Sequence, residues 1–250
     1  LENLEHWTSV NNMKMNNDKF VLLSYNKNIE IDNTYRLNDG TIIGEKSETK
    51  DLGVIMSNDG KFTKHITNLV LGSKKTISMI FRTFKTRNDQ VMLTLYKSLV
   101  LSKIDYCSVL WCPNELSELR KLEGIQSNFT LRMACAKTNS GNRLDYWQRL
   151  KHLNLYSIQR RFERYNVIYV WKILHRIVHN PGLKFKTEGV EQSRQGLTCI
   201  IPKGTSKLRE NSFLVRGPKL FNSLSRHIRK FPFDNAILQQ QAVNNFKKTP

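Results

Sequence analysis

Cysteines, acidic residues and long apolar runs are all scarce in this 250-residue chain, and each shortage excludes a class of protein. The four cysteines, Cys107, Cys112, Cys135 and Cys199, form no CxxC pair, which argues against a zinc site or a redox dithiol. They are expected to be reduced thiols of an intracellular protein. No apolar run reaches membrane-spanning length and no signal peptide is visible, so no membrane partner is expected.

The shortage of acidic residues is confined to the later part of the chain. The sequence holds 40 Lys and Arg against 21 Asp and Glu, a net charge of +19. Residues 1–60 carry about six basic and ten acidic residues, so the whole positive excess lies in residues 61–250. This asymmetry favours a polyanionic partner for the later part, and nucleic acid is the first candidate. The alternative is a charged surface that serves only solubility.

The first 60 residues are predicted to end one helix and then form short strands. Leu4, Trp7 and Val10 give residues 1–12 a helical spacing. The predicted strands are 19–25, a hairpin of 29–37 with 41–43 around an Asp-Gly turn, and 50–56. These strands are too few for a free-standing domain, so they suit the end of a larger sheet.

The rest of the chain is predicted to be mostly helical, which gives an α+β, mostly α, fold class. Ser57 or Asp59 is expected to cap the first of these helices, whose inward side would include Phe62 and Phe84. Pro113 is expected to close the central helix. The predicted helices are 61–84, 88–111, 115–137, 143–153, 155–179, 213–230 and 236–246, with a linker at 138–142 and an extended basic segment at 183–212.

Several short motifs follow one another in an order that resembles a known family. They are Trp7 with MKMNNDKF at 13–20, KDLGVIMSNDGKFTKHI at 50–66, YKSLVLSKIDYCSVLW at 96–111, KLEGIQ at 121–126, QRR at 159–161, YVWK at 169–172 and RGPKLFNSL at 216–224. Together they resemble the C-terminal part of the reverse transcriptase of non-LTR retrotransposons of the jockey or LINE type. No single motif is diagnostic, and the resemblance rests on their order across nearly the whole chain.

The resemblance implies three regions: the end of the reverse transcriptase palm at 1–60, a helical thumb at 61–138 and a basic helical C-terminal region at 143–250. The parent activity would be RNA-directed DNA polymerisation with Mg²⁺, on an RNA template and a DNA primer. The family's catalytic Ala-Asp-Asp turn would precede Leu1, together with the fingers and most of the palm. The chain is therefore expected to be a fragment that needs no cofactor of its own and does not polymerise alone.

The resemblance also assigns roles to particular residues. Lys19 would act near the incoming nucleotide, either as a general acid for pyrophosphate or as a stabiliser of its charge. The alternative is an exposed lysine at a strand edge. Asp51 and Asp59 have no second acid beside them, so both are interpreted as turn or cap residues rather than metal ligands. No metal site is predicted.

The residues expected to contact the nucleic-acid backbone lie in the 50–66 stretch and on two basic helices. They are Lys50, Gly53, Lys61, Lys64, Lys74, Lys75, Arg160, Arg161, Arg164 and Lys172. Stretch 50–66 would grip the primer end, or it would be an ordinary packing unit. Tyr165, Tyr169 and Trp171 can stack on bases but more often such a stripe is core. His175 and His179 lack a third ligand, so a metal is not expected there.

Two other functions remain open from the sequence. One is a nucleic-acid-binding module adopted by a host and no longer catalytic, and the other is a basic protein–protein scaffold. The family expectation for location is intracellular, with the nucleus as the site of action.

Overall fold

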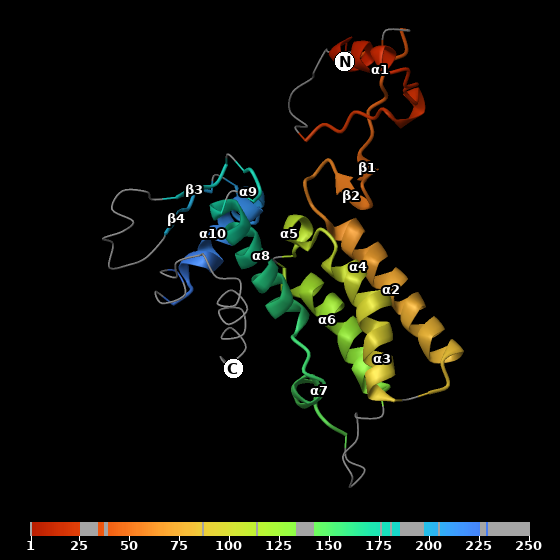
Figure 1. Cartoon of the computed structure of the whole chain (residues 1–250), viewed down its shortest axis with the longest axis vertical. Coiled ribbons are helices and arrows are strands. Elements are labelled where there is room, and N and C mark those ends of the chain that lie inside the picture. Colours follow the sequence, from red (N-terminus) through yellow and green to blue (C-terminus); the bar gives the residue numbers. More distant parts are fainter. Residues whose placement is uncertain are drawn as a thin grey trace. The chain divides into compact units, whose positions relative to one another are not determined.

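The structure is a computed structural model that describes residues 2–25, 35–37, 40–86, 88–113, 115–133, 143–175, 177–180, 182–185, 198–204, 206–225 and 229. These residues are mostly helical and include two small antiparallel sheets, as the predicted fold class requires (Figure 1). The chain divides into two compact units, 1–68 and 69–250. The second unit therefore contains residues 69–138 of the predicted thumb together with the predicted C-terminal region.

Within its described residues, the first unit contains less strand than the sequence predicts. Its elements are α1 (Glu2–Val10), the 3₁₀ turn η1 (Asn17–Lys19), β1 (Glu48–Asp51), β2 (Val54–Ser57) and the start of α2 (Thr63–Thr83). The strand predicted at 19–25 is wrong, because Lys19 ends η1 and only Leu22 forms an isolated bridge, to Glu45. Of the predicted hairpin, residues 29–34 and 38–39 lie outside the described residues, and Arg36 pairs with Ile42.

The single strand predicted at 50–56 is instead a hairpin. β1 and β2 pair in antiparallel register, with Asp51 opposite Val54. Leu52 and Gly53 form the two-residue turn, and both have positive φ, 43° and 91°. Positive φ at both central residues suits the right-handed twist of the flanking strands. The sequence Asp-Leu-Gly does not predict this turn, because leucine rarely adopts positive φ.

The turn after β2 was placed correctly, but neither proposed residue caps the helix. Gly60 donates its N–H to the Ser57 carbonyl oxygen at 2.9 Å and has φ of 68°. The Asp59 carboxylate accepts from the Lys61 N–H at 2.9 Å, two residues before α2 begins. Asp59 therefore closes a local turn of its own backbone.

The second unit contains the rest of α2 and the remaining helices. They are α3 (Asp89–Tyr96), the π-helical turn η2 (Lys97–Leu101), α4 (Ser102–Asp105), α5 (Ser108–Trp111), α6 (Leu116–Leu131), α7 (Tyr146–His152), α8 (Ile158–Leu174), α9 (Lys207–Glu210) and α10 (Phe213–Asn222). The predicted linker 138–142 and the predicted helix 236–246 lie outside the described residues. No helix of the described residues is long and apolar enough to span a membrane.

The central helix predicted at 88–111 is not continuous. It breaks after α4, where Cys107 has φ of 50°. The indole N–H of Trp111 donates to the Tyr106 carbonyl oxygen at 2.8 Å, and Trp111 is buried against Phe162. Tertiary burial of Trp111 therefore accompanies a backbone turn that helical periodicity cannot reveal.

An aromatic core joins α2, α3 and α6. The Phe129 ring lies 4.5 Å from the Tyr96 ring and 5.2 Å from the Phe81 ring, measured between centroids. Phe81 replaces Phe84 as the buried aromatic at the end of α2, and Phe84, predicted to face inward, is exposed. Leu116, at the start of α6, is 65% exposed.

A buried amide, Gln126, organises the polar part of this core. Its Oε1 accepts from the Tyr96 hydroxyl at 3.1 Å, and its Nε2 donates to the Tyr146 hydroxyl and the Tyr156 carbonyl at 3.0 and 2.9 Å. The Tyr146 hydroxyl in turn donates to Glu123. Burial raises the pKa of Tyr96 and Tyr146 above the ordinary value, so both stay neutral donors.

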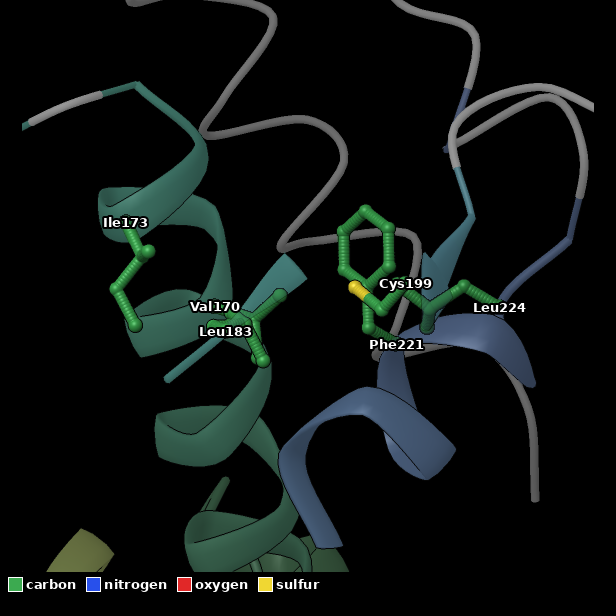
Figure 2. Close-up of a cluster of buried hydrophobic side chains, with 6 residues drawn as sticks. All are labelled: Val170, Ile173, Leu183, Cys199, Phe221 and Leu224. Carbon is green, nitrogen blue, oxygen red and sulfur yellow. The ribbon is translucent and has the colours of Figure 1, made fainter. Parts of the chain in front are cut away.

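The C-terminal helices close over a second apolar cluster (Figure 2). Val170 and Ile173 come from α8, Phe221 and Leu224 from the end of α10, and Leu183 and Cys199 from the segment between them. The sequence predicted residues 183–212 as an extended basic segment without periodicity. Instead, its described residues form the β3 (Lys184–Phe185) and β4 (Cys199–Ile200) pair and α9.

Candidate nucleic-acid interface

Exposed cations without an ion pair among the described residues gather along and beside α2. This 21-residue helix contains no aspartate or glutamate. Ile77, Ile80 and Phe81 are buried at the helical spacing of one face, which leaves the cations exposed on the other. We call the group Lys74, Lys75, Arg82, Lys103 and Arg132 the α2 basic surface.

Two cations of the α2 basic surface come from other helices. Lys103 of α4 donates from its ammonium group to the Thr76 hydroxyl at 3.2 Å. The guanidinium of Arg132, which follows α6, lies 4.0 Å from the centroid of the Phe81 ring. Neither Lys103 nor Arg132 was predicted, because only the packing of α4 and α6 beside α2 brings them there.

The predicted cations of α8 are in a different situation. Arg160 forms an ion pair with Glu163 at 3.1 Å. Arg161 holds Asp105 with two nitrogens, and the hydroxyl of Tyr165 donates to the same carboxylate. Burial opposes the charge of Arg161, but the hydrogen bond and charge of Asp105 outweigh it and raise the pKa of Arg161. Both arginines are therefore engaged by carboxylates of the fold.

The other two predicted cations of α8 have no ion pair within the described part of the chain. Lys172 is exposed. The guanidinium carbon of Arg164 lies 5.9 Å from the centroid of the Tyr156 ring, and its buried Nε has no hydrogen-bond partner. In Figure 1, α2 and α8 lie on opposite sides of the group α3, α4 and α6, so the two predicted helices do not present one shared surface.

The predicted residues of the first unit lie at turns and on its small sheet. Lys19 and Lys61 are exposed, and Gly53 forms the β1–β2 turn. Lys64 pairs with Glu48. Lys50 is exposed on β1. The pKa of His65 is lowered mainly by the burial of its own imidazole and secondly by the positive charge of Lys50.

The aromatic and histidine side chains at the end of α8 pack against other parts of the second unit. Tyr169 meets Phe213 edge to face, with centroids 5.0 Å apart, and Trp171 lies 4.0 Å from the His175 ring. Tyr169 packs at the margin of the C-terminal apolar cluster, which favours the core interpretation for that residue of the stripe. No three His, Cys, Asp or Glu side chains gather as a metal site would require, as far as the described residues extend.

Four of the motifs that carry the resemblance occupy structural junctions of the second unit. Asp105 of the 96–111 motif binds Arg161 of QRR, and Gln126 of KLEGIQ joins three tyrosines. Arg216 of RGPKLFNSL donates to Asn166 and to carbonyls of α5 and its end. These residues hold the helices of the second unit together, so their hydrogen bonds serve the fold of this chain.

Comparison of the chain with protein-family models, with curated proteins and with solved structures gives no match.

Proposed function

We propose that this chain is the C-terminal part of a non-LTR retrotransposon reverse transcriptase and that it binds template–primer nucleic acid without catalysing polymerisation. The proposal joins two lines of support. The ordered motifs give the family, and the acid-free surface of α2 gives the binding chemistry. Catalysis would need the paired aspartates of the family's palm, because two Mg²⁺ ions must bridge the attacking and leaving oxygens.

The observation that carries the binding function is the α2 basic surface. Exposed Lys and Arg without neighbouring carboxylates bind phosphates by releasing condensed counterions, independent of base sequence. Arg160 and Arg161 already neutralise carboxylates, so we assign them to the fold and remove them from the proposed contact set. Lys74 and Lys75 become the central predicted contacts.

A binding titration across a salt series tests this function. The probe is an RNA–DNA primer–template duplex, followed by fluorescence anisotropy from about 50 to 200 mM salt, where phosphate contacts weaken steeply. The double variant Lys74→Gln/Lys75→Gln should reduce the slope of log affinity against log salt by roughly two. Nucleotide incorporation, measured in parallel with Mg²⁺, should be absent.

A matched control removes the same charge from the first unit. Lys14 and Lys46 are both exposed, and Lys14→Gln/Lys46→Gln should leave the salt slope unchanged. Equal losses for the two double variants would mean that overall charge, and not the α2 basic surface, drives binding. Absence of duplex binding by the unaltered chain at low salt would favour the scaffold alternative. A coding segment for the paired aspartates directly upstream would separate a polymerase fragment from a module adopted by a host.

A further inference from the structure

Trp147 exposes 66% of its surface on the outer side of α7. By contrast, Trp111 is 1% exposed in the core, and Trp171 packs on His175. Single exposed apolar residues are common on protein surfaces, so exposure alone assigns nothing. The rigidity and the charge around this indole carry the inference.

The helix that presents Trp147 is fixed at its N-terminus and to α6. Asp145 and Gln148 form a reciprocal capping box, with distances of 2.7 and 3.0 Å. The buried Arg149 donates to the Leu144 carbonyl at 2.6 Å and to the Thr130 hydroxyl at 3.2 Å, which ties α7 to α6. The backbone that carries the indole is therefore ordered before any ligand arrives, which lowers the entropy cost of binding.

A second fixed ring lies beside the indole. The Tyr146 and Trp147 centroids are 5.3 Å apart, and the Tyr146 hydroxyl is bound by Glu123 and Gln126. Tyr146 thus limits the directions in which the indole can turn.

Two exposed cations lie near Trp147 in the sequence. Lys151 follows four residues later on the same face of α7, and Arg143 precedes the helix. Two acids are close in sequence or space. Glu123 is bound to Tyr146, and the Asp145 carboxylate accepts the Gln148 N–H at the helix N-terminus, which offsets its charge.

We propose that Trp147 is a stacking platform for unpaired bases, with Lys151 as its phosphate partner, so that α7 binds single-stranded nucleic acid. This inference rests on the proposed function, and it adds a second site with a different ligand from the α2 basic surface. An exposed indole beside cations is the combination that single-strand-binding proteins use. Bases within a duplex are stacked on one another, so the indole meets a free base face only on a single strand.

The test uses the whole chain and two labelled probes, an oligouridylate of about 12 nucleotides and a blunt RNA–DNA duplex. Trp147→Ala should weaken oligouridylate binding about tenfold, while duplex affinity stays unchanged. Trp147→Phe should retain most of the single-strand affinity, because phenylalanine keeps an aromatic face. Trp7, which is 54% exposed in the acidic first unit, supplies the control, and Trp7→Ala should bind both probes as the unaltered chain does.

Each other outcome contradicts the inference in a distinguishable way. Full oligouridylate affinity in Trp147→Ala, with salt-steep duplex binding intact, overturns the stacking site and leaves the proposed function standing. Equal loss for both probes overturns the single-strand assignment. If the unaltered chain binds neither probe at low salt, both the inference and the proposed function fail. Because Trp147 is exposed, the thermal unfolding midpoint of Trp147→Ala should match that of the unaltered chain.

Discussion

The guanidinium of Arg216 donates a hydrogen bond to the main-chain oxygen of Val109, 2.7 Å away across 107 residues of sequence. The same side chain donates to Asn166 at 3.2 Å and to the Asn211 carbonyl at 2.6 Å. Arg216 therefore joins α5, α8 and α10 at one point. Burial lowers its pKa, and its partners are carbonyl oxygens of main chain and amide rather than carboxylates.

Arg216→Met should destabilise the second unit by about 2–4 kcal/mol, because several part-buried carbonyl oxygens lose their donor at once. Urea unfolding followed by tryptophan fluorescence measures the loss. Lys219→Met is the matched control, since Lys219 is exposed on the same helix, and it should change stability little. Equal effects of the two substitutions would show that Arg216 contributes only as a surface cation.

Gly217 lets α10 approach α8 closely. A Cβ at this position would lie 2.7 Å from Phe213 Cε2 and 3.0 Å from Val170 Cγ2. Gly217→Ala should therefore cost about 1–3 kcal/mol of stability through overpacking. Gly124→Ala in α6 should stabilise by about 0.5–1 kcal/mol, because its Cβ meets nothing within 4 Å and alanine favours helix. Denaturant midpoints that move in the same direction for both variants would contradict this difference.

The helices were predictable because their signals are local. Ile77 and Ile80 repeat at helical spacing, and Asn88 and Ser157 are recognisable caps whose side chains bind the first N–H groups of α3 and α8. The break at Cys107 was not predictable, because positive φ there accompanies the burial of Trp111 against a helix some 50 residues later. The strand pairing of Phe185 with Cys199 was not predictable either, because it also depends on a contact between residues far apart in the sequence.

The positive charge of the candidate interface could be predicted from the sequence, but the particular residues that form it could not. Charge composition locates the positive excess after residue 60, and Lys74 and Lys75 follow from the helical pattern of α2. Whether a cation is free depends on its tertiary partner, as Arg161 and Asp105 show across 56 residues. Lys103 was not predicted as part of the interface for the same reason, because only the packing of α4 brings it to α2.

His65 should make the stability of the first unit depend on pH. Burial first, and then the charge of Lys50, lower the pKa of His65 below 6.5, and its Nδ1 accepts from the Ile55 N–H at 3.4 Å. The unfolded chain then binds a proton more readily than the folded one, so stability is complete above pH 6.5 and declines as pH falls toward the folded pKa. The protection factor of the Ile55 amide, which is its exchange rate corrected for the intrinsic pH dependence of exchange, should fall over this window. In His65→Gln this fall should be reduced, and an unchanged pH profile of protection would exclude His65 as its source.

Cys199 should report on the opening of the C-terminal cluster. Asn222 pairs with the Cys199 backbone in both directions at 2.9 Å, which joins α10 to β4. Burial raises the pKa of the Cys199 thiol to about 12, whereas Cys107 is exposed. Because the thiolate is the reactive form, iodoacetamide should label Cys107 in the native protein and Cys199 only on opening.

Asn222→Asp tests the link between that pairing and the cluster. The substitution removes the amide donor and places a carboxylate against the Cys199 carbonyl oxygen, so β4 should separate from α10 more often. Mass spectrometry of labelled peptides should then show faster modification of Cys199 with the rate at Cys107 unchanged. Unaltered labelling of Cys199 in Asn222→Asp would mean that the apolar contacts of Phe221 and Leu224 alone keep the cluster closed.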